Sequence, residues 1–98
     1  MDAGYPESLS GTQYMRMAMV EYERSKSITK DLYPGIAAAF GSTPARVERA
    51  IRHATEVACD RLGYFGVTQL YGNTIDPERG RPTNHEAIAR LAKLLHDN

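Results

Sequence analysis

With 98 residues, 12 basic and 12 acidic side chains and a formal net charge of zero, the chain has room for one domain and no general attraction to nucleic acid or membranes. Any basic function must therefore come from a local cluster of arginines. Because no apolar stretch approaches the roughly 20 residues that span a bilayer and the N-terminus lacks a secretory signal pattern, we expect a soluble, cytoplasmic protein.

The first part of the chain predicts a flexible lead-in followed by a helix. Residues 1–11 are polar and lack hydrophobic periodicity, so we expect a flexible lead-in or a linker remnant there. From residue 12 to about residue 24, apolar residues recur at helical spacing. The methionines of this helix, Met15, Met17 and Met19, have two interpretations. They either fill the core or form a surface for a partner.

Two short helical segments are predicted next. Ser27 is typical of an N-cap for a short helix over residues 28–33, which Pro34 ends, kinks or replaces with a new helix. Residues 35–40 are rich in alanine, a strong helix former, and Gly41 supplies a stop.

The strongest helix signal begins at Thr43 and extends to about residue 62. Thr43 is a good N-cap, and Pro44 suits the first helical position, where its missing N–H costs nothing. At roughly 100° per residue, one face is apolar and carries Val47, Ile51, Ala54 and Ala58. The opposite face carries Arg46, Glu48, Arg49, Arg52, His53 and Glu56. Such a concentration of arginine predicts a face that binds another molecule. Near the end of the same helix, Cys59 is expected to be a small buried thiol.

The helix over residues 35–40, the turn at 41–43 and the long helix together predict a helix-turn-helix. Many all-α domains contain such a corner without contacting DNA. The spacing alone therefore leaves DNA binding and a purely structural corner both open.

The last third of the chain predicts two more helices. Gly63 closes the long helix, and Phe65, Val67, Leu70 and Tyr71 predict a short amphipathic helix over residues 64–71. Thr83 and Glu86 form a capping box that begins the last helix. Its apolar positions are Ile88, Leu91, Ala92 and Leu95. The expected fold is an all-α, compact bundle of about six helices.

The longest loop covers residues 73–82 and carries Arg79 and Arg81. Two interpretations of these arginines remain open at this point. They either contact a phosphate backbone or are solvated loop charges.

No catalytic or metal-binding constellation is present in the sequence. His53, His85 and His96 lie far apart without the spacing of metal ligands, and Cys59 has no nucleophile-activating partner near it in sequence. We therefore expect no enzymatic activity, no metal and no cofactor.

Several runs resemble one family in order and spacing. Residues 27–30, 32–34 with 36–37, 46–54, 56–58 and 82–84 are similar to the C-terminal DNA-binding domain of the stage-zero sporulation master regulator of endospore-forming bacteria, a response regulator of two-component systems. The resemblance covers about residues 12–95, and residues 46–54 are its most specific part. It implies that residues 12–98 form a helix-turn-helix effector domain that regulates transcription.

The resemblance also implies which residues contact double-stranded DNA. In that family the helix corresponding to residues 43–62 enters the major groove and reads a TGTCGAA-like box. The implied contact residues are Ser42, Thr43, Arg46, Glu48, Arg49, Arg52 and His53. The chemistry agrees, because arginine matches the O6 and N7 acceptors of guanine, glutamate accepts from cytosine N4, and a helix N-terminus favours phosphate.

The resemblance further implies two partners. Tandem boxes are bound by two domains arranged head to tail, and the segment corresponding to residues 63–73 contacts an RNA polymerase sigma factor. This sequence departs from the family pattern in residues 63–73 and at Cys59, where a tryptophan is usual. The alternative function is a helical protein-interaction module whose arginine-rich face binds an acidic partner.

Overall fold

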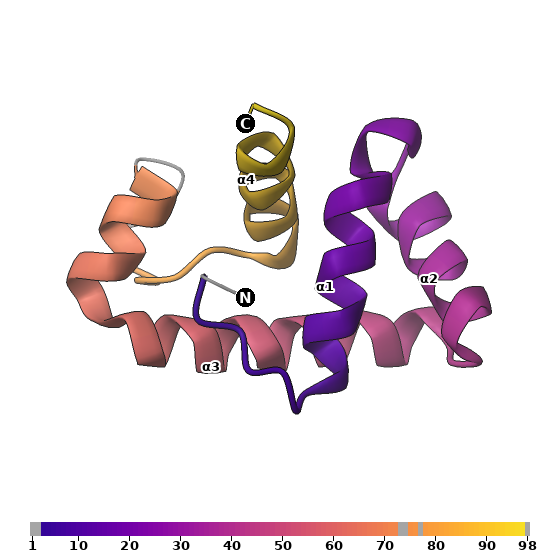
Figure 1. Cartoon of the computed structure of the whole chain (residues 1–98), viewed down its shortest axis with the longest axis horizontal. Coiled ribbons are helices and arrows are strands. Elements are labelled where there is room, and N and C mark those ends of the chain that lie inside the picture. The colour runs from indigo at the N-terminus through magenta and orange to yellow at the C-terminus, as the bar shows by residue number, and fades with distance from the viewer. Residues whose placement is uncertain (1–2, 73–74, 77, 98) are drawn as a thin grey trace.

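The computed structural model describes residues 3–72, 75–76 and 78–97, and all regular structure within these ranges is helical (Figure 1). Its α-helices are α1 (Ser10–Glu21), α2 (Tyr33–Phe40), α3 (Pro44–Tyr71) and α4 (Asn84–His96). Two shorter pieces are the 3-10 turn η1 (Tyr22–Arg24) and the π-helical segment η2 (Ile28–Leu32). The all-α class is confirmed. The expectation of about six helices was wrong, because η2 runs directly into α2 and residues 44–71 form one bent helix.

Local signals fix the boundary between α2 and α3. Gly41 ends α2 in the left-handed region at a φ of 65°, and the N–H of Ser42 donates to the carbonyl of Ala37 over 2.8 Å. The hydroxyl of Thr43 then accepts from the N–H of Arg46 over 3.2 Å. The predicted caps are therefore confirmed, and a connection of residues 41–43 alone separates α2 from α3.

The helix α3 lies along one side of the molecule, and α1, α2 and α4 all pack against it (Figure 1). The apolar residues predicted to face the core, Val47, Ile51, Ala54 and Ala58, are buried. The crossing of α1 over α3 is close at Gly11, where an added Cβ would lie 2.0 Å from the carbonyl oxygen of Ala50. Nearby on α1, Met15 is fully buried, which favours the core interpretation of that methionine.

The residues before α1 run alongside α3 and contribute to the core (Figure 1). Tyr5 is only 2% exposed, and its hydroxyl forms a 2.7 Å hydrogen bond with that of Thr55, fifty residues along the chain. The hydroxyl of Thr12 donates to the carbonyl of Pro6. α1 itself begins at Ser10, inside the stretch expected to be a lead-in. The lack of periodicity in residues 1–11 concealed these contacts because their partners are distant in sequence.

The helix α3 bends at Gly63, whose φ of 72° and ψ of 174° are not helical. The expected helix over residues 64–71 is therefore the second part of α3 (Figure 1). Val67 and Tyr71 are buried there as predicted, whereas Phe65 is 74% exposed and Tyr64 is 85% exposed. Phe65 precedes Val67 by two positions, a rotation of about 200° around the helix that turns its side chain to solvent.

Candidate nucleic-acid interface

The start of α3 presents a polar side to solvent while its apolar side is covered. Val47 and Ile51 are fully buried. The contact residues expected from the sequence are all at least partly exposed: Ser42, Thr43, Arg46, Glu48, Arg49, Arg52 and His53. The periodicity therefore assigned the faces of this helix correctly.

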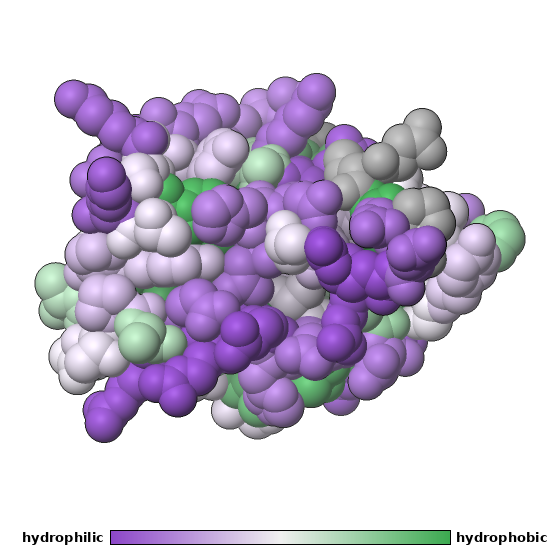
Figure 2. Space-filling view, turned by 180° about the vertical axis from the view of Figure 1, so that it is seen from behind, coloured by the Kyte–Doolittle hydropathy of each residue, from purple (hydrophilic) through white to green (hydrophobic). Residues whose placement is uncertain are grey.

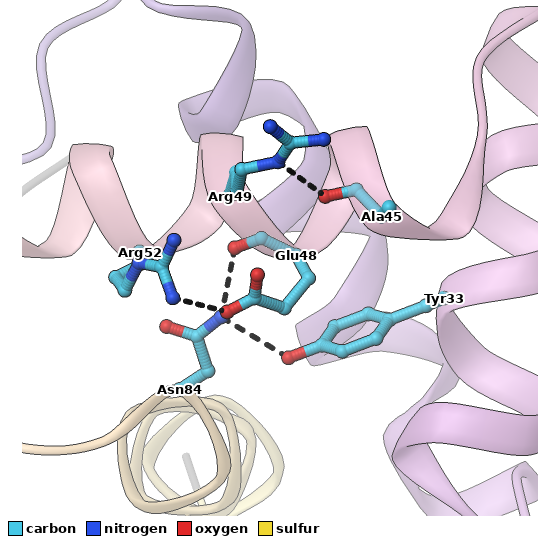
Figure 3. Close-up of polar contacts among 6 residues, drawn as sticks. All are labelled: Tyr33, Ala45, Glu48, Arg49, Arg52 and Asn84. Carbon is cyan, nitrogen blue, oxygen red and sulfur yellow. Dashed lines mark hydrogen bonds and ion pairs between the residues drawn. The ribbon is translucent and has the colours of Figure 1, made fainter.

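These residues divide between two edges of α3, as Figure 3 shows for three of them. Glu48 and Arg52 point toward α4, and Nη1 of Arg52 donates to Oε1 of Glu48 over 3.0 Å. Arg49 lies on the other edge, where its Nε donates to the carbonyl of Ala45 over 3.4 Å. At helical spacing, Arg46 lies about 60° from Arg49 on the side away from Arg52, and His53 lies between Arg46 and Arg49, so both share the edge of Arg49.

The two edges differ in the state of their charges. Within residues 3–72, 75–76 and 78–97, neither Arg46 nor Arg49 forms an ion pair. Their guanidinium groups are available to a ligand. Arg52 instead pairs with Glu48. Because both side chains of this pair reach solvent, the pair contributes little to folding, and its main effect is to hold both groups in one orientation.

Asn84 attaches the first turn of α4 to the edge of α3 that carries Glu48. Its Nδ2 donates to the backbone carbonyl of Glu48 over 3.0 Å and to the hydroxyl of Tyr33 over 3.1 Å (Figure 3). Burial raises the pKa of Tyr33, so this hydroxyl keeps its proton near neutral pH. One amide therefore joins α4 to both α3 and α2. This junction could not be predicted from the sequence, because it depends on contacts between residues that are distant in the chain.

A groove of about 630 Å³ runs between this edge of α3 and the chain that leads into α4. Its charged and histidine lining comes from Glu48, Arg52 and Glu56 on α3 and from Arg79, Arg81 and His85 on the other side. Figure 2 shows the molecule from behind, where a band of strongly hydrophilic side chains crosses the surface from the end at which α3 begins. The groove therefore extends the polar surface of α3 toward α4.

The two arginines of the predicted loop both contact carboxylates across this region. Nη2 of Arg81 lies 3.2 Å from Oε2 of Glu56, and Nη1 of Arg79 lies 3.5 Å from Oε1 of Glu86. Arg81 therefore ties the loop to α3, and Arg79 ties it to α4. Neither interpretation of the sequence anticipated these pairs. Residues 73, 74 and 77 of the predicted loop lie outside the described residues.

The described part of the chain contains no group of three or more His, Cys, Asp or Glu side chains placed to hold a metal ion. Cys59 is buried as predicted, and this burial raises the pKa of its thiol above the ordinary value. Such a thiol is a poor nucleophile at neutral pH. No helix in the same residues has both the length and the apolar character needed to cross a membrane.

A family of known proteins matches nearly the whole chain. The model of the family described as "Sporulation initiation factor Spo0A C terminal" matches residues 1–95. The match takes in the candidate interface on α3, the groove and the chain before α1 that contains Tyr5. It extends further toward the N-terminus than the resemblance seen in the sequence, which began at about residue 12.

Proposed function

The chain belongs to the family of the C-terminal domain of the sporulation initiation factor Spo0A, a DNA-binding domain of a sporulation regulator, and we propose that it reads its DNA with the start of α3. In this proposal α2, the connection at 41–43 and α3 act as a helix-turn-helix, with α3 in the major groove. The proposed contact residues are Ser42, Thr43, Arg46, Glu48, Arg49, Arg52 and His53.

The observation that carries this proposal is the pair of guanidinium groups on the uncovered edge of α3. Arg46 and Arg49 are exposed and free of ion pairs among the described residues. Arginine presents two parallel donors that match O6 and N7 of guanine. A TGTCGAA-like box offers guanine on both strands at its central CG step, so Arg49 has a suitable target there.

Glu48 complements this reading from the other edge of α3. The Oε1 atom of Glu48 accepts from Arg52, which leaves Oε2 to accept from the N4 amino group of cytosine. The Arg52 partner also reduces the electrostatic cost of bringing a carboxylate close to DNA.

The N-terminus of α3 supplies the proposed phosphate contacts. The hydroxyl of Thr43 uses a lone pair to accept from Arg46 N–H, so its own proton remains available for a phosphate oxygen. Ser42 lies beside it, where the positive end of the helix dipole favours an anion. His53 contacts a phosphate or a sugar. These contacts fix the position of the helix without reading sequence.

The proposed partners beyond a single DNA site follow from the family. Two domains bind tandem boxes head to tail, and the second part of α3 contacts an RNA polymerase sigma factor in the cytoplasm. The exposed Tyr64 and Phe65 support a protein contact there, because two neighbouring large apolar side chains are open to solvent. Residues 12–98 carry the effector function in this proposal.

The test is a titration of the purified chain against two duplexes of equal length at one moderate salt concentration. One duplex carries tandem TGTCGAA-type boxes, and the other carries the same bases scrambled. A tenfold preference, about 1.4 kcal/mol, is expected if α3 reads bases. Equal affinity for both duplexes would contradict the proposal. Absence of binding to either duplex would favour the alternative function, an interaction with an acidic protein.

A further inference from the structure

We propose that the chain leading into α4 is a second DNA-binding element, in which Arg79 and Arg81 bind backbone phosphates beside the major groove that holds α3. This inference rests on the proposed function, because it requires α3 to lie in that groove. It assigns a role to two arginines outside the helix-turn-helix.

The first support is the position of the two arginines beside α3. An α-helix with its side chains is about 10–12 Å wide, which nearly fills a major groove of about 12 Å. An element that flanks the helix therefore meets the sugar-phosphate backbone at the edge of the groove. Arg79 and Arg81 line the groove beside Arg52, and Asn84 holds this region against α3 through the carbonyl of Glu48.

The second support is that both arginines have N–H donors that their ion pairs do not use. A guanidinium has five N–H donors, and each of these side chains contacts one carboxylate oxygen, on Glu56 or on Glu86. The side chains of Arg79 and Arg81 remain 45% and 46% exposed. The carboxylates therefore place the arginines and leave further N–H groups to face a phosphate.

The third support is the distribution of carboxylates on α3. Glu48 and Glu56 both line the groove, and an unpaired carboxylate at that edge would repel the DNA backbone. Arg52 pairs with Glu48 on the same helix, whereas Glu56 receives its arginine from outside the helix. Arg81 therefore removes a repulsive charge and adds donors at the same place.

The experiment compares Arg81→Gln, Glu56→Gln and the control Arg24→Gln with the unchanged chain. Arg24 is 80% exposed and pairs with Glu21; it lies in η1, which follows the end of α1 remote from α3 (Figure 1). Affinities for the boxed and scrambled duplexes are measured at several salt concentrations. Thermal melting of each variant confirms that it is folded.

Arg81→Gln is expected to weaken binding to both duplexes by the same factor and to reduce the slope of log affinity against log salt by about 0.9, the value for one lost phosphate contact. Glu56→Gln is expected to strengthen binding to both duplexes, because it removes a negative charge from the groove while the amide oxygen can still accept from Arg81 and hold it in place. Arg24→Gln should change neither affinity nor slope. If the ion pair between Arg81 and Glu56 only stabilised the fold, Arg81→Gln and Glu56→Gln would change the affinity for DNA in the same direction. Opposite changes therefore indicate that Arg81 contacts DNA.

An unchanged salt slope in Arg81→Gln, or weaker binding in both Arg81→Gln and Glu56→Gln, would overturn this inference. Failure of the proposed function has a different signature. The unchanged chain would then show no preference for the boxed duplex. A chain with that preference, combined with an unchanged slope in Arg81→Gln, would overturn the second contact alone.

Discussion

Asn84 and Glu48 lie 36 positions apart in the chain, and the side-chain amide of Asn84 donates to the backbone carbonyl of Glu48 over 3.0 Å. The same nitrogen donates to the hydroxyl of Tyr33 over 3.1 Å. The first turn of α4 is therefore held against both helices of the proposed helix-turn-helix. The position of the groove arginines depends on this junction.

We expect Asn84→Asp to destabilise the fold by about 1–3 kcal/mol, the usual cost of leaving a partly buried hydrogen-bonding group without its partner. The Tyr33 hydroxyl can turn and donate to the carboxylate, but the carbonyl oxygen of Glu48 can only accept, so it would lose its donor and face a second acceptor. Considered only as a residue at the start of α4, an aspartate would be favourable because of the helix dipole. Urea unfolding distinguishes the two effects, because the lost hydrogen bond lowers the free energy of unfolding and the helix dipole would raise it. His85→Gln, at the next and exposed position, is the control and should leave stability unchanged.

Arg49→Ala should weaken binding to the boxed duplex by about 1–3 kcal/mol, the value of one bidentate base contact. Binding to the scrambled duplex should fall less, so the preference between the duplexes shrinks. Thermal melting should not change, because the side chain is exposed and makes one long hydrogen bond, to Ala45. Arg49→Lys should not restore the preference, since lysine lacks the planar fork. Undiminished affinity of Arg49→Ala for the box would remove Arg49 from the reading residues.

Gly11→Ala and Gly35→Ala should change stability in opposite directions. An added Cβ at Gly11 would lie 2.0 Å from the carbonyl oxygen of Ala50, so α1 must move away from α3. We expect a loss of about 1–3 kcal/mol, typical of overpacking. At Gly35 nothing lies within 4 Å, and the change should stabilise α2 by about 0.5–1 kcal/mol. Urea midpoints measure both effects, and a stable Gly11→Ala would show that the two helices do not meet this closely.

Stability should fall as pH rises through the range in which thiols ionise. Burial raises the pKa of Cys59 in the folded chain, whereas an unfolded cysteine has a pKa of about 8.5. The unfolded chain therefore loses this proton first, and the stabilisation present below about pH 8.5 is lost progressively above it. Unfolding measured between pH 7 and pH 9.5 should show a shallower decline in Cys59→Ala. Equal slopes in the two chains would contradict this effect of burial.

The sequence predicted those parts of the fold that depend on neighbouring residues. The caps at Thr43 and Thr83 and the left-handed Gly41 each act within one turn of chain. The buried face of α3 follows from helical periodicity alone. These local rules were sufficient to locate α3 and to place Arg46 and Arg49 on its open side.

The remaining features depend on contacts that no local pattern contains. Tyr5 is a core residue because Thr55 lies opposite it, and Arg81 is positioned by Glu56. The number of helices was overestimated because proline and glycine are ambiguous signals. Pro34 lies in the first turn of α2, which follows η2 without a break. Gly63 interrupts the helix with non-helical torsions where a boundary was predicted, but the next piece follows at once, so both belong to α3. Whether the seven proposed residues contact DNA stays a prediction.

The pairing of Arg52, Arg79 and Arg81 with glutamates also bears on how the domain searches a genome. Genomic DNA offers about 10⁶–10⁹ competing non-specific sites, and a protein binds to them mainly through electrostatic attraction to phosphates. A chain with no net charge, whose groove arginines are partly offset by these glutamates, gains less from those sites than a strongly basic domain does. We therefore expect brief encounters and a large pool of unbound molecules, so that occupancy of a target follows the number of copies in the cell.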